Sequence, residues 1–361
     1  MENLKYLKSL IETRSDENCS QICNLLIETF SPFANEIITC GENNQNLIIG
    51  LNTTIKNSSP IILSGHIDTV KADETMYLTN PYNLVIQGDK AFGLGVIDMK
   101  CFFSSILDNI ESIKSLTTPI VICITSDEET KFEGIVSICN KLKELDVKPK
   151  YAIIGEPTNK LIMKSAKGCF EFKLEITGKS CHSSNPSAGI NSICVAAKFI
   201  GLIEELSKSL TFTTLNTGVI SGGKMTNQVP AECTLTFDIR TSNENELNDV
   251  LNKIKTYIDV LKDEYLGASV VLTQILEIKP LFDKLSTDFI KILKDLNLEF
   301  SDFMGGCEAG YFQEFCDNVI LFGAGDLSLA HKPNEFLNLN DYSSYNKTFV
   351  SLLERLSNVK Q

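Results

Sequence analysis

The sequence lacks features that whole classes of proteins need. Its 361 residues contain no apolar run that approaches the length of a transmembrane helix. Acidic residues outnumber basic ones, with 46 Asp and Glu against 33 Lys and Arg, and the formal net charge is -13. That charge repels nucleic-acid phosphates and anionic lipid headgroups, so we expect neither nucleic acid nor a membrane as a partner. We expect a soluble protein that acts on a small molecule.

Paired cysteine motifs are also missing. The twelve cysteines are scattered without any C-x-x-C pair, and several lie within apolar segments, as do Cys123, Cys194 and Cys233. Scattered cysteines in apolar segments behave as small buried hydrophobic residues, whereas disulfide frameworks belong to oxidising compartments. The pattern therefore predicts a cytoplasmic protein without a disulfide framework.

Histidine occurs only three times, at His66, His182 and His331. Neutral imidazole is the commonest protein ligand for zinc, and charged imidazole donates to a developing anion. Each histidine lies in a short segment suited to hold a metal ion or a reacting carbonyl. Because the chain uses histidine nowhere else, we expect all three to serve chemistry and not packing.

Continuous apolar runs mark one kind of region. They lie at 61–63, 121–124, 152–154 and 319–322, with helical stretches between them. Runs of this kind suit strands that are covered on both faces, as in parallel sheets. The sequence predicts an α/β domain, in which a mainly parallel sheet carries helices on both faces.

Strict alternation of apolar and polar residues marks the other region, at 170–177 and 233–239. Period-two alternation indicates strands with one wet face, and hence an antiparallel sheet. Two amphipathic stretches, 190–207 and 244–261, can cover its apolar face as helices. The sequence thus predicts an α+β insert.

The chain is long for a single hydrophobic core, so two domains are expected. We place a discontinuous α/β domain at 1–165 and 279–361, interrupted by the insert at 166–278.

Metal-ligand side chains gather where the expected strands end. They are His66, Asp68, Asp98, Glu128, Glu129 and Glu156. In open α/β sheets, ligands bind beyond the carboxyl ends of the strands. If these ends converge, four carboxylates crowd together, which requires compensating cations. Two zinc-like ions would meet that need, although any one of these acids alone would more simply be an exposed strand-end residue.

The order of these motifs resembles a known family, the dinuclear zinc amidohydrolases. This family includes acetylornithine deacetylase, succinyl-diaminopimelate desuccinylase, aminoacylase and glutamate carboxypeptidase. The resemblance covers nearly the whole chain, through SGHIDTV (64–70), GLGVIDMK (93–100), SDEET (126–130), GEPT (155–158), HSSNP (182–186), GGKMTNQVP (222–230), DIR (238–240) and AHKPNE (330–335). The combined order is specific, whereas any single motif is weak.

The resemblance implies a role for each ligand-type residue. Asp98 would bridge two divalent ions, zinc or alternatively cobalt. His66 and Glu156 would complete one site, and Glu129 and His331 the other.

The implied reaction is metal-assisted hydrolysis of an amide. Zinc lowers the pKa of a bound water from about 15.7 to about 7, and Glu128 would take its proton as general base. Asp68 would hydrogen-bond His66 and fix its ring. His182 would donate to the oxyanion. In this family the insert histidine reaches the active site of the partner subunit, which implies a homodimer through the insert, although the sequence alone also allows a surface histidine.

Within the family, three features resemble the acetylornithine deacetylase branch: GLG at 93–95, Thr130 and CEA at 307–309. This resemblance implies an N-acyl amino acid substrate, N-acetyl-L-ornithine, and a place in arginine biosynthesis. The alternatives are a succinyl-diaminopimelate desuccinylase, or a broader metallopeptidase or aminoacylase. A non-catalytic metal-binding scaffold is disfavoured, because Glu128 has no structural duty that requires it beside a ligand.

Arginine is also scarce, with only three copies, and a substrate with two carboxylate ends would require several guanidinium groups. Arg240, beside Asn227 in the insert motifs, can clamp a single α-carboxylate. Glu308 can meet a side-chain ammonium such as that of ornithine. The alternatives are a strand-face ion pair for Arg240 and a solvated acid for Glu308.

Overall fold

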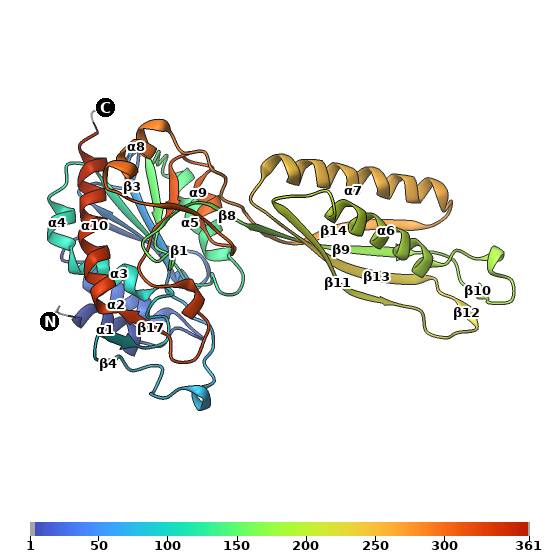
Figure 1. The fold of residues 1–361 in the computed structure, drawn as a ribbon, viewed down its shortest axis with the longest axis horizontal. Helices are drawn as coiled ribbons and strands as arrows, with labels where there is room; N and C mark the ends of the chain where they lie inside the picture. The colour runs from blue at the N-terminus through green and yellow to red at the C-terminus, as the bar shows by residue number, and fades with distance from the viewer. Residues whose placement is uncertain (1–3, 360–361) are drawn as a thin grey trace. The chain divides into compact units, whose positions relative to one another are not determined.

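The computed structural model describes residues 4–359, which divide into two compact units (Figure 1). The first unit comprises Met1–Ser165, Asp283–Phe303 and Glu308–Gln361, and the second comprises Ala166–Phe282 and Met304–Cys307. No helix within the described residues is long and apolar enough to cross a membrane.

An eight-stranded sheet forms the centre of the first unit, in the order β1-β2-β6-β3-β7-β16-β8-β15. The strands are β1 (Glu36–Cys40), β2 (Asn46–Leu51), β3 (Ile61–His66), β6 (Ile120–Thr125), β7 (Tyr151–Ile154), β8 (Ile162–Ala166), β15 (Phe300–Phe303) and β16 (Val319–Leu321). Strands β6, β3, β7 and β16 run parallel to one another, whereas β1, β2 and β8 pair antiparallel with their neighbours. The four parallel strands are the four continuous apolar runs, so the prediction of a mainly parallel sheet is confirmed.

Helices cover both faces of this sheet. One face shares a hydrophobic core with α1 (Lys5–Glu12), α2 (Ser20–Phe30), α3 (Lys100–Asp108), α4 (Ile110–Lys114), α8 (Thr287–Asp295) and α10 (Leu339–Ser357). Alternate strand residues such as Ile61 and Leu63 belong to that core. The sheet also contacts α5 (Glu133–Glu144) and α9 (Ala309–Phe312), whose buried residues lie outside that core. The predicted layering is confirmed.

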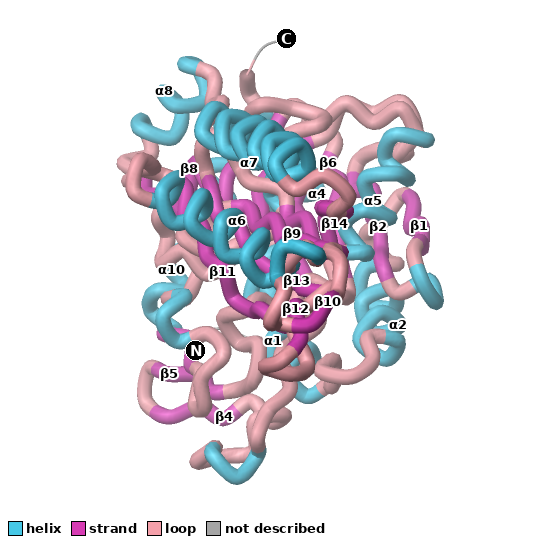
Figure 2. Tube along the Cα trace, turned by 90° about the vertical axis from the view of Figure 1, so that its right-hand side faces the viewer, coloured by secondary structure: helices cyan, strands magenta, loops and turns pink. Residues whose placement is uncertain are grey.

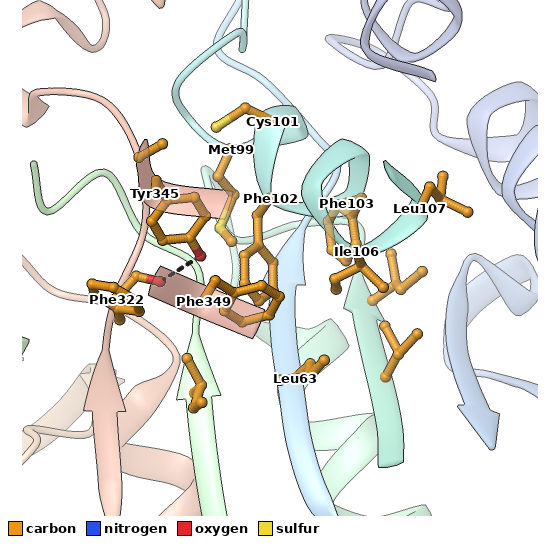
Figure 3. Packing of buried hydrophobic residues seen from close by; sticks show 14 of the residues in the cluster. Leu63, Met99, Cys101, Phe102, Phe103, Ile106, Leu107, Phe322, Tyr345 and Phe349 are labelled. Atoms are coloured by element: carbon orange, nitrogen blue, oxygen red, sulfur yellow. Dashed lines mark hydrogen bonds between the residues drawn. The ribbon is translucent and has the colours of Figure 1, made fainter. Parts of the chain in front are cut away.

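The start of α3 lies tightly against the ends of β3 and β7. A Cβ atom at Gly65 would come within 2.1 Å of Met99 Cε, and one at Gly155 within 2.0 Å of Phe102 Cγ. The Phe102 ring has no room to withdraw, because it packs edge-on against Phe349 with 5.7 Å between centroids (Figure 3). Glycine at position 155 therefore permits the close approach of α3, whereas a side chain at position 65 would first displace the end of the flexible Met99 side chain.

The first unit also contains a three-stranded sheet in the order β17-β5-β4. Its members are β4 (Val85–Gln87), β5 (Lys90–Phe92) and β17 (Phe336–Asn338), and β17 pairs antiparallel with β5. The pairing joins the segment that follows His331 to the segment that precedes Asp98.

The second unit contains a four-stranded antiparallel sheet in the order β11-β13-β9-β14. Its strands are β9 (Gly168–Thr177), β11 (Thr213–Gly222), β13 (Glu232–Thr241) and β14 (Ser269–Ile278), and a short pair, β10 (Cys181–His182) and β12 (Gln228–Val229), lies beside it in the chain. Helices α6 (Ser192–Ser207) and α7 (Glu244–Glu264) pack on one face and share a single core with it (Figures 1 and 2). The predicted antiparallel insert sheet with two helices is confirmed.

Candidate metal centre

His66 ends strand β3 and is almost fully buried, with 1% of its surface exposed. Its Nδ1 lies 3.0 Å from the backbone carbonyl oxygen of Asp68 and 3.5 Å from the Asp68 carboxylate. Because a carbonyl oxygen only accepts, Nδ1 carries a proton and donates it, which leaves Nε2 as the ligand atom. Nε2 faces Asp98 Oδ1 at 3.1 Å.

A neutral Nε2 and a carboxylate oxygen repel each other at this distance unless a proton or a cation lies between them. Burial disfavours charged His66, but its hydrogen bonds to Asp68 and Asp98 outweigh burial and raise its pKa well above the usual value. A metal ion bound by His66 Nε2 and Asp98 Oδ1 would remove the repulsion between these two atoms without a proton.

His331 supplies the second imidazole from the loop after β16, where its backbone adopts a left-handed conformation with φ of 57°. Its Nε2 lies 2.8 Å from Glu129 Oε1 and 3.4 Å from Asp98 Oδ2. The hydrogen bonds to Asp98 and Glu129 raise the pKa of His331 to about 10. Asp98 therefore lies between two imidazoles, with one oxygen towards each.

Two further carboxylates, those of Glu156 and Glu128, have raised pKa values because they are buried close to other acids. Burial, followed by repulsion from Asp98, raises the pKa of Glu156 to about 8, and its Oε1 has no hydrogen-bond partner among the described residues. Desolvation raises the pKa of Glu128 well above its usual value, and repulsion from Glu156 and Glu129 adds to the rise. Buried acids without partners are stabilised by cations.

The ligand atoms fall into groups that fit metal ions. One group is His66, Asp98 and Glu156, and another is Asp98, Glu129 and His331; within each, the ligand atoms lie within 4.8 Å of one another. A third group, His66 with Glu128 and Glu129, overlaps both. We call the set His66, Asp98, Glu129, Glu156 and His331 the metal centre. Its imidazole and carboxylate donors, and the orphaned Glu156 oxygen, fit two divalent cations that share Asp98.

Asp68 holds the backbone of the loop after β6, in addition to the His66 ring that the sequence led us to expect. Its two carboxylate oxygens accept the backbone N–H groups of Glu128 at 3.2 Å and Glu129 at 3.0 Å. His66 Nδ1 contacts Asp68 at two places, the backbone carbonyl oxygen at 3.0 Å and the carboxylate at 3.5 Å. Asp68 thus ties the end of β3 to the loop after β6.

Glu308, expected to be either a substrate ligand or a solvated acid, is 1% exposed. The solvated alternative is therefore wrong. Neither carboxylate oxygen has a hydrogen-bond partner among the described residues, and the nearby Thr125 hydroxyl donates instead to the Gly65 carbonyl at 3.2 Å. Burial raises the pKa of Glu308 to about 8. The contact between Glu308 and a substrate ammonium stays a prediction, because only 1% of its surface is exposed in this arrangement.

The remaining expected residues lie in the second unit. His182 is exposed, and its Nδ1 lies 2.8 Å from Ser184 Oγ and accepts the Ser184 backbone N–H at 3.2 Å. The Asn227 carbonyl accepts the Ser183 N–H at 3.0 Å, so the loop of Asn227 lies beside that of His182. Arg240 Nε donates to Asp238 Oδ2 at 2.8 Å, which is the strand-face ion pair considered as its alternative.

Two buried ionisable residues near the metal centre had no role in the sequence interpretation. Lys100 is 2% exposed, and its Nζ donates to the Thr13 carbonyl at 3.0 Å; burial lowers the pKa of Lys100 to about 8. Glu335 accepts three backbone N–H groups of the segment that ends at Asp98. Both residues stand within motifs that the sequence displayed, but residue type alone does not show which acid or amine is buried.

Comparisons with known proteins place this geometry in context. The M20 family model described as "Peptidase dimerisation domain" matches residues 165–266. Acetylornithine deacetylase from Pasteurella multocida is 31% identical over 346 residues, which cover 91% of this chain and 89% of that protein. The solved aminopeptidase PepT from Bacillus cereus has a TM-score of 0.80 at 19% identity, with 98% of each chain covered. A dinuclear metal-binding M20 peptidase from Bacillus subtilis has a TM-score of 0.69 at 13% identity, covering 98% of this chain and 97% of that one.

Proposed function

The chain belongs to the M20 family of metallohydrolases, and from that premise we propose that it hydrolyses the amide bond of an N-acyl amino acid. The proposed substrate is N-acetyl-L-ornithine, cleaved to ornithine and acetate in arginine biosynthesis. The observation that carries the hydrolysis is the pair of three-residue ligand groups that share Asp98. The substrate is supported by the 31% identity to acetylornithine deacetylase from Pasteurella multocida.

The proposed cofactors are two divalent cations, zinc or cobalt, held by the metal centre. Asp98 would bridge them, with His66 and Glu156 on one and Glu129 and His331 on the other. When bound, the cations would polarise the acyl carbonyl and acidify the attacking water.

Glu128 is the proposed general base. Its backbone is held by Asp68, and its pKa lies well above the usual value because the carboxylate is desolvated among other acids. A raised pKa suits a group that must both take and return a proton near neutral pH. Glu128 would take a proton from the attacking water and deliver it to the leaving amine.

His182 is the proposed donor to the oxyanion. Because its Nδ1 accepts the Ser184 N–H, that nitrogen is unprotonated in the neutral ring, and Nε2–H remains as the donor. His182 lies in the segment matched by the dimerisation-domain model. We propose a homodimer formed through this unit, in which His182 serves the metal centre of the partner subunit.

Asn227 and Arg240 are the proposed contacts for the substrate α-carboxylate. The ion pair with Asp238 engages Nε of Arg240, so the terminal nitrogens of the guanidinium are the ones that a carboxylate would meet. All twelve cysteines lie among the described residues and none of them forms a disulfide, which supports the reducing cytoplasm as the proposed location.

The decisive experiment compares N-acetylornithine, succinyl-diaminopimelate and simple dipeptides on zinc- and cobalt-loaded protein. We expect the highest kcat/KM for N-acetylornithine. A higher kcat/KM for succinyl-diaminopimelate or for dipeptides would overturn the proposed substrate but support the proposed hydrolase activity. Two bound metal ions with no turnover of any of them would favour a metal-binding scaffold. Glu128→Gln protein, purified in parallel, controls for contaminating hydrolases.

A further inference from the structure

The carboxylate of Glu335 lies in a nest of backbone N–H groups. Oε1 accepts the N–H of Ile97 at 2.7 Å and of Asp98 at 3.3 Å, and Oε2 accepts the N–H of Gly95 at 3.0 Å. The side chain is 3% exposed. Gly95 has a φ of 74°, a left-handed conformation that turns its N–H towards the same acceptor as the two following donors.

The nest holds the backbone of Asp98, the residue shared by both ligand groups. Glu335 itself follows His331 by four residues and directly precedes β17. Its own carbonyl oxygen accepts the Gly93 N–H at 3.3 Å, and the next residue, Phe336, pairs with Phe92 in β5. The segment with His331 and the segment with Asp98 are therefore joined by main-chain pairing and by the Glu335 carboxylate.

We infer that Glu335 is a positioning residue for the metal centre, fixing Asp98 and His331 relative to each other although its carboxylate is not one of the ligands. The inference rests on the proposed function, in which Asp98 and His331 bind the metal ions. The physical reason is geometric: a bridging ligand must present each oxygen to a different ion, so a small rotation of the Asp98 backbone displaces both.

Glutamine at position 335 cannot replace the carboxylate. A carboxylate accepts at both oxygens, whereas the amide of glutamine has one oxygen and one NH2 group. If the oxygen keeps the Ile97 and Asp98 contacts, the NH2 group faces the Gly95 N–H, and two donors then oppose each other in a buried place. The nest must open, and Asp98 moves with it.

The test is metal binding by Glu335→Gln, measured without substrate. Titration of metal-free protein with Zn2+ by calorimetry, and the visible spectrum of the Co2+ form, report affinity and coordination directly. We expect affinity to fall roughly 10- to 100-fold, with a changed Co2+ spectrum, as for other groups that orient metal ligands. Glu246→Gln is the matched control, because Glu246 also accepts two backbone N–H groups, those of Thr211 and Phe212, in the second unit. It should bind metal as the wild type does.

The outcomes separate this inference from the proposed function. Wild-type protein that binds two ions while Glu335→Gln binds both with unchanged affinity and spectrum overturns the inference alone, even if the variant melts earlier. Wild-type protein that binds fewer than two ions overturns the metal centre and the inference with it. If Glu335→Gln does not fold, Glu335→Asp keeps the charge but withdraws it by one methylene, and the same comparison of affinity and spectrum decides.

Discussion

Glu308→Gln should stabilise the metal-free protein, and increasingly so as the pH rises. The pKa of Glu308 is raised from 4.5 to about 8 because the carboxyl is buried, and the nearby Thr125 hydroxyl offsets this rise only in part. Since the folded-state pKa lies above the unfolded one, the neutral form favours folding. The stability is fully present below the unfolded pKa and is lost as the pH rises through the folded pKa.

The size of the effect follows from this shift. The rise of the pKa from 4.5 to about 8 corresponds to about 5 kcal/mol, at about 1.4 kcal/mol for each pKa unit. Glutamine has nearly the same shape and never ionises, so it avoids this loss. Between about pH 5.5 and about pH 8.5, the stability of Glu308→Gln relative to the wild type should rise by roughly 3 kcal/mol.

Urea unfolding of both proteins in chelator, at those two pH values, measures this difference. Added metal should shrink it, because nearby cations stabilise the ionised carboxylate. A difference that does not grow with pH would refute the burial argument. The same variant also tests the role expected from the sequence: if Glu308 meets a substrate ammonium, KM for N-acetylornithine rises, whereas a buried acid beneath the site leaves KM unchanged.

Three further predictions concern the metal centre and its partners. Glu128→Gln should keep both metal ions and lose roughly 10²- to 10⁴-fold in kcat, because the base acts only in the transition state; full turnover with full metal content would exclude that role. His182→Ala should lose roughly 10²- to 10³-fold, and hybrids formed by reassociating it with Glu128→Gln should regain part of the activity. Hybrids that form but stay inactive would argue against a shared site. Chelation should lower the melting temperature, since ions at 1,000 times their Kd contribute about 4 kcal/mol; an unshifted curve in metal-free protein would count against the dinuclear centre.

The central strands and their ends were predictable from the sequence because burial on both faces leaves a direct mark. The runs at 61–63 and 121–124 became β3 and β6, and His66 follows from the first of them. Strand β2 carries an equally continuous run, yet it pairs antiparallel with both β1 and β6. An apolar run indicates that a strand is buried, but it does not indicate whether the strand runs parallel or antiparallel to its neighbours. For β2 that direction depends on the short β1–β2 connection.

Local spacing in the sequence predicts two further features, and the first is the strand-face ion pair given above as the alternative for Arg240. Asp238 and Arg240 stand two apart on β13, so their side chains share a face, and the ion pair follows from period two alone. The hairpin spacing from β1 to β2, with Gly41 at a φ of 79°, is likewise a local signal.

The surroundings of each acidic side chain could not be predicted from the sequence. Glu128, Glu308 and Glu335 are the same residue type, each in a motif, and yet their surroundings assign them different work. Desolvation beside other carboxylates suits Glu128 to proton transfer, whereas Glu335 accepts three backbone N–H groups, which oppose the rise of its pKa to about 8 on burial and tie it to the segment that ends at Asp98. Glu308 is buried with no backbone N–H donor, and burial favours its neutral form. The number of donors that converge on a carboxylate is set by distant segments of the chain, so it can be counted only after those segments have been folded together.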